Sequence, residues 1–239
     1  MCGIVGVVSD RREEGHLKEM LNIQNYRGPD ADGIYIDEDR GVHLGHNRLS
    51  IQDVSSAAHQ PFHSDCHNYI IVFNGEVYNF KEIKKTLLKL DYTFVSNSDT
   101  EVILYAYKEW GISSIEKFIG MFSFAIYDLK KAKLFVVRDR AGVKPLYYTE
   151  QDDTFLFASE LKSLYNYPKF VREINRKILP FYFQFAYIPA PHTIYKNCYK
   201  LKAGHYIEYD LETKNLKIEK YWDINDFYLM EKRIVKGMH

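Results

Sequence analysis

The order of apolar segments along the chain is the feature that most constrains its fold. Short apolar runs with strand character come in blocks, and segments with helical spacing come in blocks between them. Strict alternation of strand and helix is typical of a doubly wound parallel sheet, so this order favours a layered α+β fold. The expected strands are 4–8, 42–51, 69–73, 122–128, 133–138, 147–148, 155–158, 205–209 and 216–218, and the expected helices are 16–24, 80–90, 99–110 and 178–185.

Local signals mark several of the boundaries. Ser98 and Glu101 match a capping box, in which the serine caps the helix and the glutamate reaches back to the N-cap N–H. Gly111 is expected to end that helix. Residues 27–33 are rich in glycine, proline and aspartate and predict a loop. The two lysines at 130–131 predict a hairpin turn between the flanking strands.

The composition excludes several classes of protein. The chain has 239 residues, and its 32 Lys and Arg balance 32 Asp and Glu, so no net charge attracts nucleic acid or an anionic membrane. No apolar stretch approaches the length of a membrane span, and the charged residues that follow Val8 argue against a secretion signal. Cys2, Cys66 and Cys198 show neither disulfide nor metal spacing. We therefore expect a cytoplasmic protein with no metal site.

The cysteine at position 2 predicts a nucleophile. It follows the initiator Met1 and opens an apolar run. If Met1 is removed, Cys2 carries both a thiol and a free α-amine on one residue. The α-amine has an ordinary pKa of about 7.7–8.0, so it is partly uncharged at neutral pH and can accept the thiol proton.

Polar residues at the ends of other segments could complete a site for an amino-acid amide. Asn74 and the N–H of Gly75 could donate to an oxyanion, while Arg48 could hold a carboxylate and Asp99 an ammonium group. Each has an ordinary alternative: a surface ion pair for Arg48, a favourable helix N-terminal charge for Asp99, and a hairpin turn for Asn74-Gly75. Spacing alone does not show that these residues converge.

A series of motifs in one order closely resembles the glutaminase domain of class II glutamine amidotransferases, specifically the asparagine synthetase (glutamine-hydrolysing) group. The resemblance extends over more than nine-tenths of the chain. The motifs lie at residues 2–6, 27–30, 45–51, 60–61, 73–79, 98–104, 120–122, 138–148, 157–162, 187–191 and 204–206.

This resemblance implies an N-terminal nucleophile (Ntn) hydrolase fold, a four-layer αββα sandwich of two antiparallel sheets between helices. It implies hydrolysis of the side-chain amide of L-glutamine to glutamate and ammonia through a glutamyl thioester. The implied roles are Cys2 as nucleophile with its α-amine as base, Arg48 on the substrate carboxylate, Glu76 and Asp99 on the substrate amino group, and Asn74 with the Gly75 N–H as the oxyanion hole.

The resemblance places the glutaminase domain at residues 1–222 and leaves 223–239 as a tail or the start of a linker. No Ser-Gly-Gly-x-Asp-Ser type loop for pyrophosphate is found. The ATP-dependent synthetase domain or subunit that would use the ammonia is therefore expected elsewhere, and ATP and Mg²⁺ only there, with no cofactor in this domain. We expect the partner to dock near the aromatic segment Phe181 to Pro191. The sequence is also compatible with a homodimer.

Two other functions are compatible with the same residues. One is a non-catalytic module that binds glutamine or a partner without turnover. The other is an amidotransferase domain that serves an acceptor other than aspartate, because the acceptor is recognised by the absent half.

Overall fold

The computed structural model describes residues 1–226 and 228 of the protein. The strands of this part form two sheets in which every neighbouring pair is antiparallel. Sheet A has the order β10 (Cys198–Lys200), β8 (Tyr147–Gln151), β9 (Thr154–Ala158), β1 (Gly3–Val8), β3 (Val42–Arg48) and β2 (Ala31–Asp37). Sheet B has the order β12 (Asn215–Lys220), β11 (His205–Asp210), β7 (Lys133–Arg138), β6 (Gly120–Asp128), β5 (Tyr69–Val77) and β4 (Phe62–His63).

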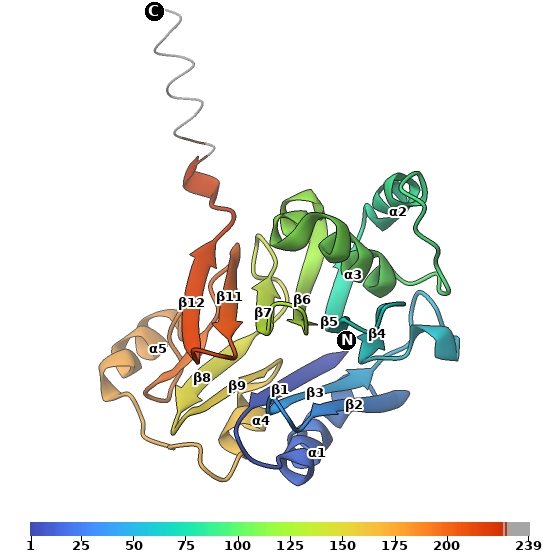
Figure 1. Ribbon diagram of the computed structural model, residues 1–239. Helices are drawn as coiled ribbons and strands as arrows, with labels where there is room; N and C mark the ends of the chain where they lie inside the picture. The colour runs from blue at the N-terminus through green and yellow to red at the C-terminus, as the bar shows by residue number, and fades with distance from the viewer. Residues whose placement is uncertain (227, 229–239) are drawn as a thin grey trace, which may run out of the picture.

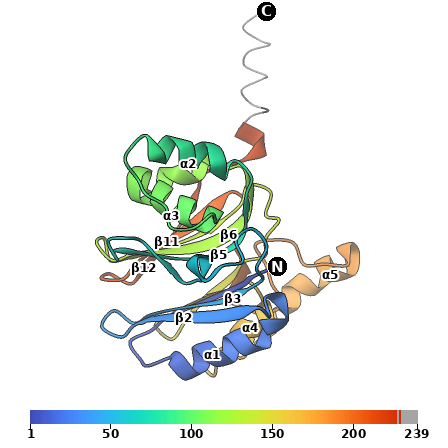
Figure 2. The same cartoon turned by 90° about the vertical axis from the view of Figure 1, so that its right-hand side faces the viewer.

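Helices cover the outer face of each sheet (Figure 1). Sheet A is covered by α1 (Glu14–Ile23) and α4 (Leu161–Tyr165), and sheet B by α2 (Phe80–Leu88) and α3 (Asp99–Trp110). Figure 2 shows the resulting order of layers: helices, sheet B, sheet A, helices. The prediction of a four-layer α+β sandwich is confirmed.

The three apolar clusters correspond to the three spaces between these layers. One cluster fills the space between the sheets, and the other two lie between each sheet and its helices. In β1, Ile4 and Val8 face the space between the sheets, while Val5 and Val7 face α1 and α4. Side chains alternate along a strand. Because β1 is buried on both faces, its sequence is apolar without interruption.

The expected elements are largely found, with corrections to some bounds and a few additional short elements. Strand β5 continues to Val77, so Asn74-Gly75 lies inside a strand and is not the hairpin turn considered above. Strand β3 ends at Arg48, not at residue 51. The short elements β4, α4 and β10 have no counterpart among the predictions.

The prediction of a loop over residues 27–33 is partly wrong, because β2 begins at Ala31. Residues 31–37 pair along the whole of β3, with Ala31 opposite Arg48. The main-chain hydrogen bonds to β3 thus outweigh the turn-forming composition of Ala31-Asp32-Gly33. As an edge strand with half-buried side chains, β2 lacks the apolar pattern that would have revealed it.

The capping box at α3 is half confirmed. Ser98 Oγ accepts from the N–H of Thr100 at 3.0 Å. Glu101 does not reach back to Ser98. Its carboxylate instead accepts from the N–H groups of Val95 and Ser96 and from the Ser96 hydroxyl. The helix ends as expected at Gly111, which has a φ of 63°.

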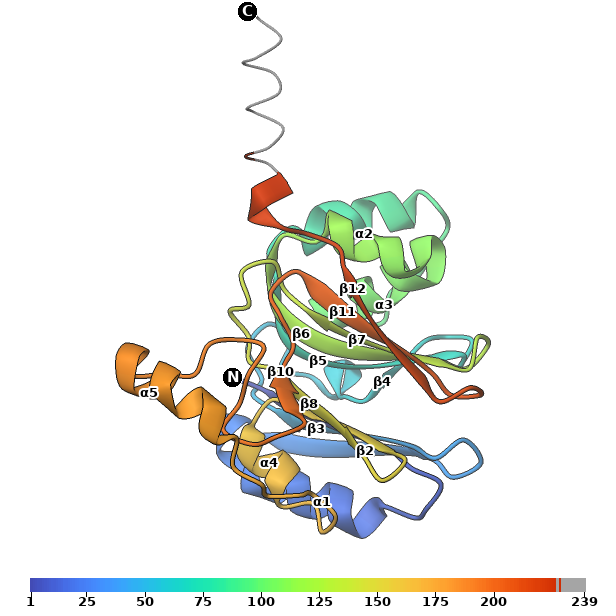
Figure 3. The same cartoon turned by 90° about the vertical axis from the view of Figure 1, so that its left-hand side faces the viewer.

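One helix stands apart from the layers. Helix α5 (Leu179–Phe185) has no buried residue, and its aromatic side chains contact one another instead of the core. Figures 2 and 3 show it projecting on the side of the molecule where the N-terminus lies. No helix in the described range has the length and apolarity needed to cross a membrane. The predicted tail, 223–239, lies largely outside the described residues.

Candidate active site

The predicted nucleophile precedes the central strand of sheet A. Cys2 is followed by β1, whose Gly3 pairs with Asn47 of β3. Its thiol contacts the residue after β3: the Leu49 N–H donates to Cys2 Sγ at 3.4 Å, and Sγ lies 3.7 Å from the Leu49 carbonyl oxygen. Arg27 Nε donates to the Cys2 carbonyl oxygen at 2.9 Å. These contacts fix Cys2 on both its side-chain and main-chain sides.

Burial raises the pKa of the Cys2 thiol. The Leu49 hydrogen bond, the amino terminus of the chain and the cations Arg48 and Lys144 act in the opposite direction. The thiol therefore needs a nearby base to become a thiolate at neutral pH.

Arg48 is the last residue of β3 and is buried. Its guanidinium donates to the main-chain oxygens of Asp53 and Ser55 in the loop that follows. Asp53 in turn accepts from the N–H of Asn97, beside the start of α3. Arg48 is thus not the exposed ion-pair residue of the ordinary interpretation, because it ties the end of β3 to this loop.

The alternation of side chains along β5 explains where Asn74 and Glu76 point. Ile70 and Val72 belong to the cluster between the sheets, so Asn74 and Glu76, in the same alternation, also face sheet A. Asn74 is 1% exposed, and neither its Nδ2 nor its Oδ1 has a hydrogen-bond partner among the described residues. Buried amides are normally hydrogen-bonded, so Asn74 is an exception among the buried side chains and a candidate for binding a ligand.

The main chain of β5 places the Gly75 N–H on the side of the strand that faces away from β6. The N–H of Phe73 donates to Gln60 Oε1 at 2.6 Å, and that of Val77 donates to Asp99 Oδ2 at 2.9 Å. Main-chain groups two residues apart point to the same side, so the Gly75 N–H lies between these two. A Cβ at this position would lie 2.3 Å from the Met121 oxygen, so only glycine is accommodated.

Asp99 begins α3 and is buried against β5. Burial raises the pKa of its carboxyl to about 6, and the nearby Glu76 carboxylate acts in the same direction. The N–H groups of Val77, Asp99 and Thr100 oppose the shift. A cation bound between Glu76 and Asp99 would relieve this cost, since an opposite charge favours the ionised carboxyl.

A single pocket brings all of these residues together. Its lining includes every residue proposed from the sequence, which come from both sheets and from α3. They are Cys2, Arg48, Asn74, Gly75, Glu76 and Asp99. The pocket lies at one end of the space between the sheets, where polar side chains replace the apolar ones on the same faces of β1, β3 and β5.

The family of the chain can now be stated. Residues 1–222 match the family described as "Glutamine amidotransferase domain". The chain belongs to this family. Among curated relatives of this amidotransferase, asparagine synthetase [glutamine-hydrolyzing] 2 of Bacillus subtilis is 38% identical over 97% of the chain, which covers 32% of that protein. A relative in Methanocaldococcus jannaschii is 37% identical over 99% of the chain, which covers 50% of it.

Solved structures agree on the fold. The glutamine phosphoribosylpyrophosphate amidotransferase of Bacillus subtilis superposes with a TM-score of 0.69 over 92% of this chain and 49% of that one, at 18% identity. This likeness confirms the expected Ntn hydrolase fold. The amidotransferase chain thus spans between a third and a half of the curated relatives cited above.

Two further pocket residues were not singled out from the sequence. Gln60 bridges β5 and α3, since its Nε2 donates to Thr100 Oγ1 at 3.2 Å. Lys144 enters from the loop between β7 and β8. Both lie inside motifs that carried the resemblance, but neither the spacing nor the residue type indicated a position in the pocket. No group of described His, Cys, Asp and Glu side chains is arranged to hold a metal ion.

Proposed function

We propose that this amidotransferase domain hydrolyses the side-chain amide of L-glutamine to glutamate and ammonia. The observation that carries the proposal is the convergence of a thiol, two oxyanion donors and groups for both charges of an amino acid on one pocket. Arg48 binds the glutamine carboxylate, and Glu76 and Asp99 bind its ammonium group. This orientation points the side-chain amide toward Cys2.

The reaction proceeds in two halves. After removal of Met1, the α-amine of Cys2 accepts the thiol proton, and the sulfur attacks the amide carbon. Asn74 Nδ2 and the Gly75 N–H donate to the oxyanion that forms. The carbon–nitrogen bond then breaks, the nitrogen takes up the proton and leaves as ammonia, and a glutamyl thioester remains. Water attacks the thioester, which releases glutamate and restores the thiol.

Met1 bears directly on this proposal, because it lines the pocket beside Cys2 and is half exposed. Its removal would both free the α-amine and enlarge the entrance. The test is steady-state release of ammonia and glutamate from glutamine by protein whose mass shows that Met1 is lost. Equal release of both products supports hydrolysis. Glutamine binding without release would favour the non-catalytic binding module instead.

We further propose that the ammonia passes to an ATP-dependent synthetase portion that forms asparagine from aspartate. The names of the relatives and their greater length support this step. ATP and Mg²⁺ would act in that portion, while the hydrolysis above uses only groups of this domain. We also expect the protein in the cytoplasm. If the synthetase portion uses ammonia to amidate a carboxylate other than that of aspartate, the acceptor is that other compound.

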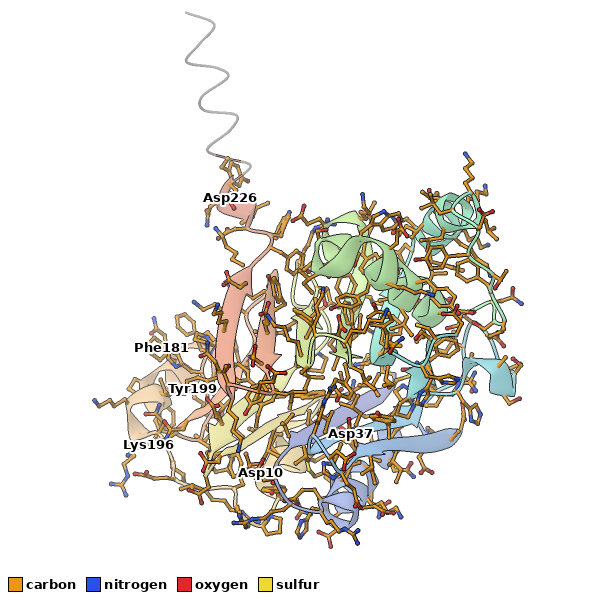
Figure 4. All side chains as sticks on the ribbon, in the orientation of Figure 1. Asp10, Asp37, Phe181, Lys196, Tyr199 and Asp226 are labelled. Carbon is orange, nitrogen blue, oxygen red and sulfur yellow. The ribbon has the colours of Figure 1, made fainter. Side chains whose placement is uncertain are left out.

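The exposed aromatic face of α5 is our proposed docking surface for that portion. Phe183 is 81% exposed, and Phe181, Phe185 and Tyr187 of the same segment are also exposed. Figure 4 shows Phe181 and Tyr199 on one flank of the molecule, and Figures 2 and 3 place α5 on the same side as the N-terminus. A partner that receives ammonia must reach this side, because Cys2 lies there.

The docking proposal can be tested with the synthetase portion of the Bacillus subtilis relative as probe. Binding by the natural chain, and a loss of at least about tenfold for Phe183→Ser, would support it. Unchanged binding for Phe183→Ser, or no binding by the natural chain, would contradict it. If Phe183→Ser instead converts a dimer of this chain to a monomer, the face joins two copies.

A further inference from the structure

Lys144 is a buried cation in the pocket to which the reaction above assigns no role. Only 5% of its surface is exposed, and it lines the same pocket as Cys2. It belongs to the loop between β7 and β8, so it approaches Cys2 from a different element than Arg48 does. Long cationic side chains are rarely so buried unless a charge or a ligand compensates them.

The main chain that carries Lys144 is firmly held. The Asp139 carboxylate is fully buried and accepts hydrogen bonds from within the loop and from β6. The donors are the N–H groups of Phe122, Ala141, Val143 and Lys144. Arg138 closes the loop from the other side by donating to the carbonyl oxygens of Gly142, Lys144 and Leu201. The loop therefore presents Lys144 from a fixed base.

Neither charged group of the bound substrate is assigned to Lys144. Glutamine brings one carboxylate, which Arg48 neutralises, and one ammonium group, which Glu76 and Asp99 neutralise. Once glutamine is bound, Arg48 is compensated and contributes less positive potential at the thiol. Lys144 is then the pocket side-chain cation that the substrate carboxylate does not engage, and it lowers the pKa of a thiol whose pKa burial raises.

We propose that Lys144 supplies the positive charge that stabilises the Cys2 thiolate and the oxyanion that follows from its attack. This inference rests on the proposed glutaminase reaction and adds a residue to it. The proton still moves from the thiol to the α-amine, and Lys144 exchanges none. A fixed charge in a site partly screened from water acts more strongly than the same charge in solvent.

The test measures the reactivity of the thiol directly and does not require turnover. Protein that has lost Met1 is alkylated with iodoacetamide between pH 6 and 10, and the rate at Cys2 is followed by mass spectrometry of its N-terminal peptide, which separates it from the exposed Cys66. For Lys144→Met we expect the rate profile to move to higher pH, with alkylation about tenfold slower near pH 7. Lys144→Arg keeps the charge and should stay within about twofold of the natural protein, a small fraction of a pKa unit.

Lys130→Met serves as the control, because Lys130 lies in the exposed turn between β6 and β7, at the opposite end of these strands. The other charged groups of the pocket (the α-amine, Arg48, Asp53, Glu76 and Asp99) are the same in all variants. Superimposable profiles for natural protein and a folded Lys144→Met would overturn the proposal, as would an equal slowing in Lys144→Arg. Failure of the natural protein to release ammonia would instead count against the glutaminase reaction.

Discussion

The two ends of the space between the sheets differ in how their buried polar groups are satisfied. At the end away from the pocket, the Tyr127 hydroxyl donates to Asp37 Oδ2 at 2.7 Å, and Arg40 donates to the Leu129 oxygen. At the pocket end, Asn74 has no partner among the described residues, and the same is true of Ser123 Oγ beside it on β6. Satisfied groups join the two sheets, whereas unsatisfied buried groups carry an energetic cost that a ligand can relieve.

His46 lies between these two extremes. Its Nε2 contacts the Phe73 carbonyl oxygen at 3.0 Å, and because a carbonyl can only accept, Nε2 carries the proton. Burial lowers the pKa of the ring to about 3, so the side chain is neutral at physiological pH. This bond links β3 of sheet A to β5 of sheet B immediately before Asn74. It connects the side of the pocket that holds Cys2 to the side that holds the oxyanion donors.

The largest expected effect separates Cys2 from the other cysteines. Cys2→Ala removes the nucleophile and should lower glutaminase kcat by at least about a thousandfold, as loss of a nucleophile does in other acyl-transfer enzymes. Cys66→Ala is the matched control, because Cys66 is exposed and does not line the pocket. Steady-state ammonia release measures both. Comparable activity in Cys2→Ala and Cys66→Ala would remove Cys2 from the mechanism.

The second effect contrasts two asparagines. Asn74→Ala removes one oxyanion donor and should cost about 2.7–4 kcal/mol of barrier, or roughly 10²–10³ in kcat. Its melting temperature should hold or rise, because no internal hydrogen bond is lost. Asn79 bonds the main chain at Lys117 and Ile119, so Asn79→Ala should lose stability and keep kcat. Both variants are measured by steady-state kinetics and thermal melting. A loss of stability with unchanged kcat in Asn74→Ala, together with a loss of kcat in Asn79→Ala, would contradict these two roles.

The third effect is a pH dependence. In the proposed reaction the ammonium group of glutamine binds ionised Asp99, whose pKa is about 6 in the folded protein. As pH falls below 6, kcat/KM for glutamine should fall by up to about tenfold per unit. Because this pKa is raised on folding, protonation of Asp99 favours the folded state as pH falls from 7 toward 4. Asp99→Asn should have a low kcat/KM for glutamine at every pH and should lack this decrease below pH 6. If the variant retains the decrease, the titration belongs to another group.

The smallest effect belongs to the satisfied end. Tyr127→Phe deletes the hydroxyl that bonds Asp37, and hydrogen bonds to charged groups contribute about 1.5–3 kcal/mol. The free energy of unfolding should fall by that order, as measured by denaturant titration, while kcat stays within about twofold. A large loss of kcat with unchanged stability would show that this end also serves the reaction.

The sequence predicted the layered fold because short apolar strand runs and helical segments come in blocks and do not strictly alternate. It did not predict β2, whose pairing with β3 depends on main-chain bonds and not on side-chain pattern. The motifs identified each proposed site residue, but neither their convergence nor the presence of Gln60 and Lys144 in the pocket. Strand β5 is buried on both faces, so its run from Ile70 to Phe73 shows no alternation from which the direction of Asn74 could be read. The position of Lys144 depends on hydrogen bonds of its main chain to Asp139 and Arg138, which residue type and spacing do not reveal.

The pocket end of the sandwich, where buried polar groups lack partners, is in this account a glutamine-specific thiol site that is formed when Met1 is removed. The most direct measurement is the intact mass of the purified protein before and after incubation with an electrophilic glutamine analogue, with Cys2→Ala alongside. The account predicts loss of Met1 and one stoichiometric adduct that is absent from the variant and prevented by excess glutamine. Retained Met1 with no adduct, or an adduct that persists in Cys2→Ala, would contradict it.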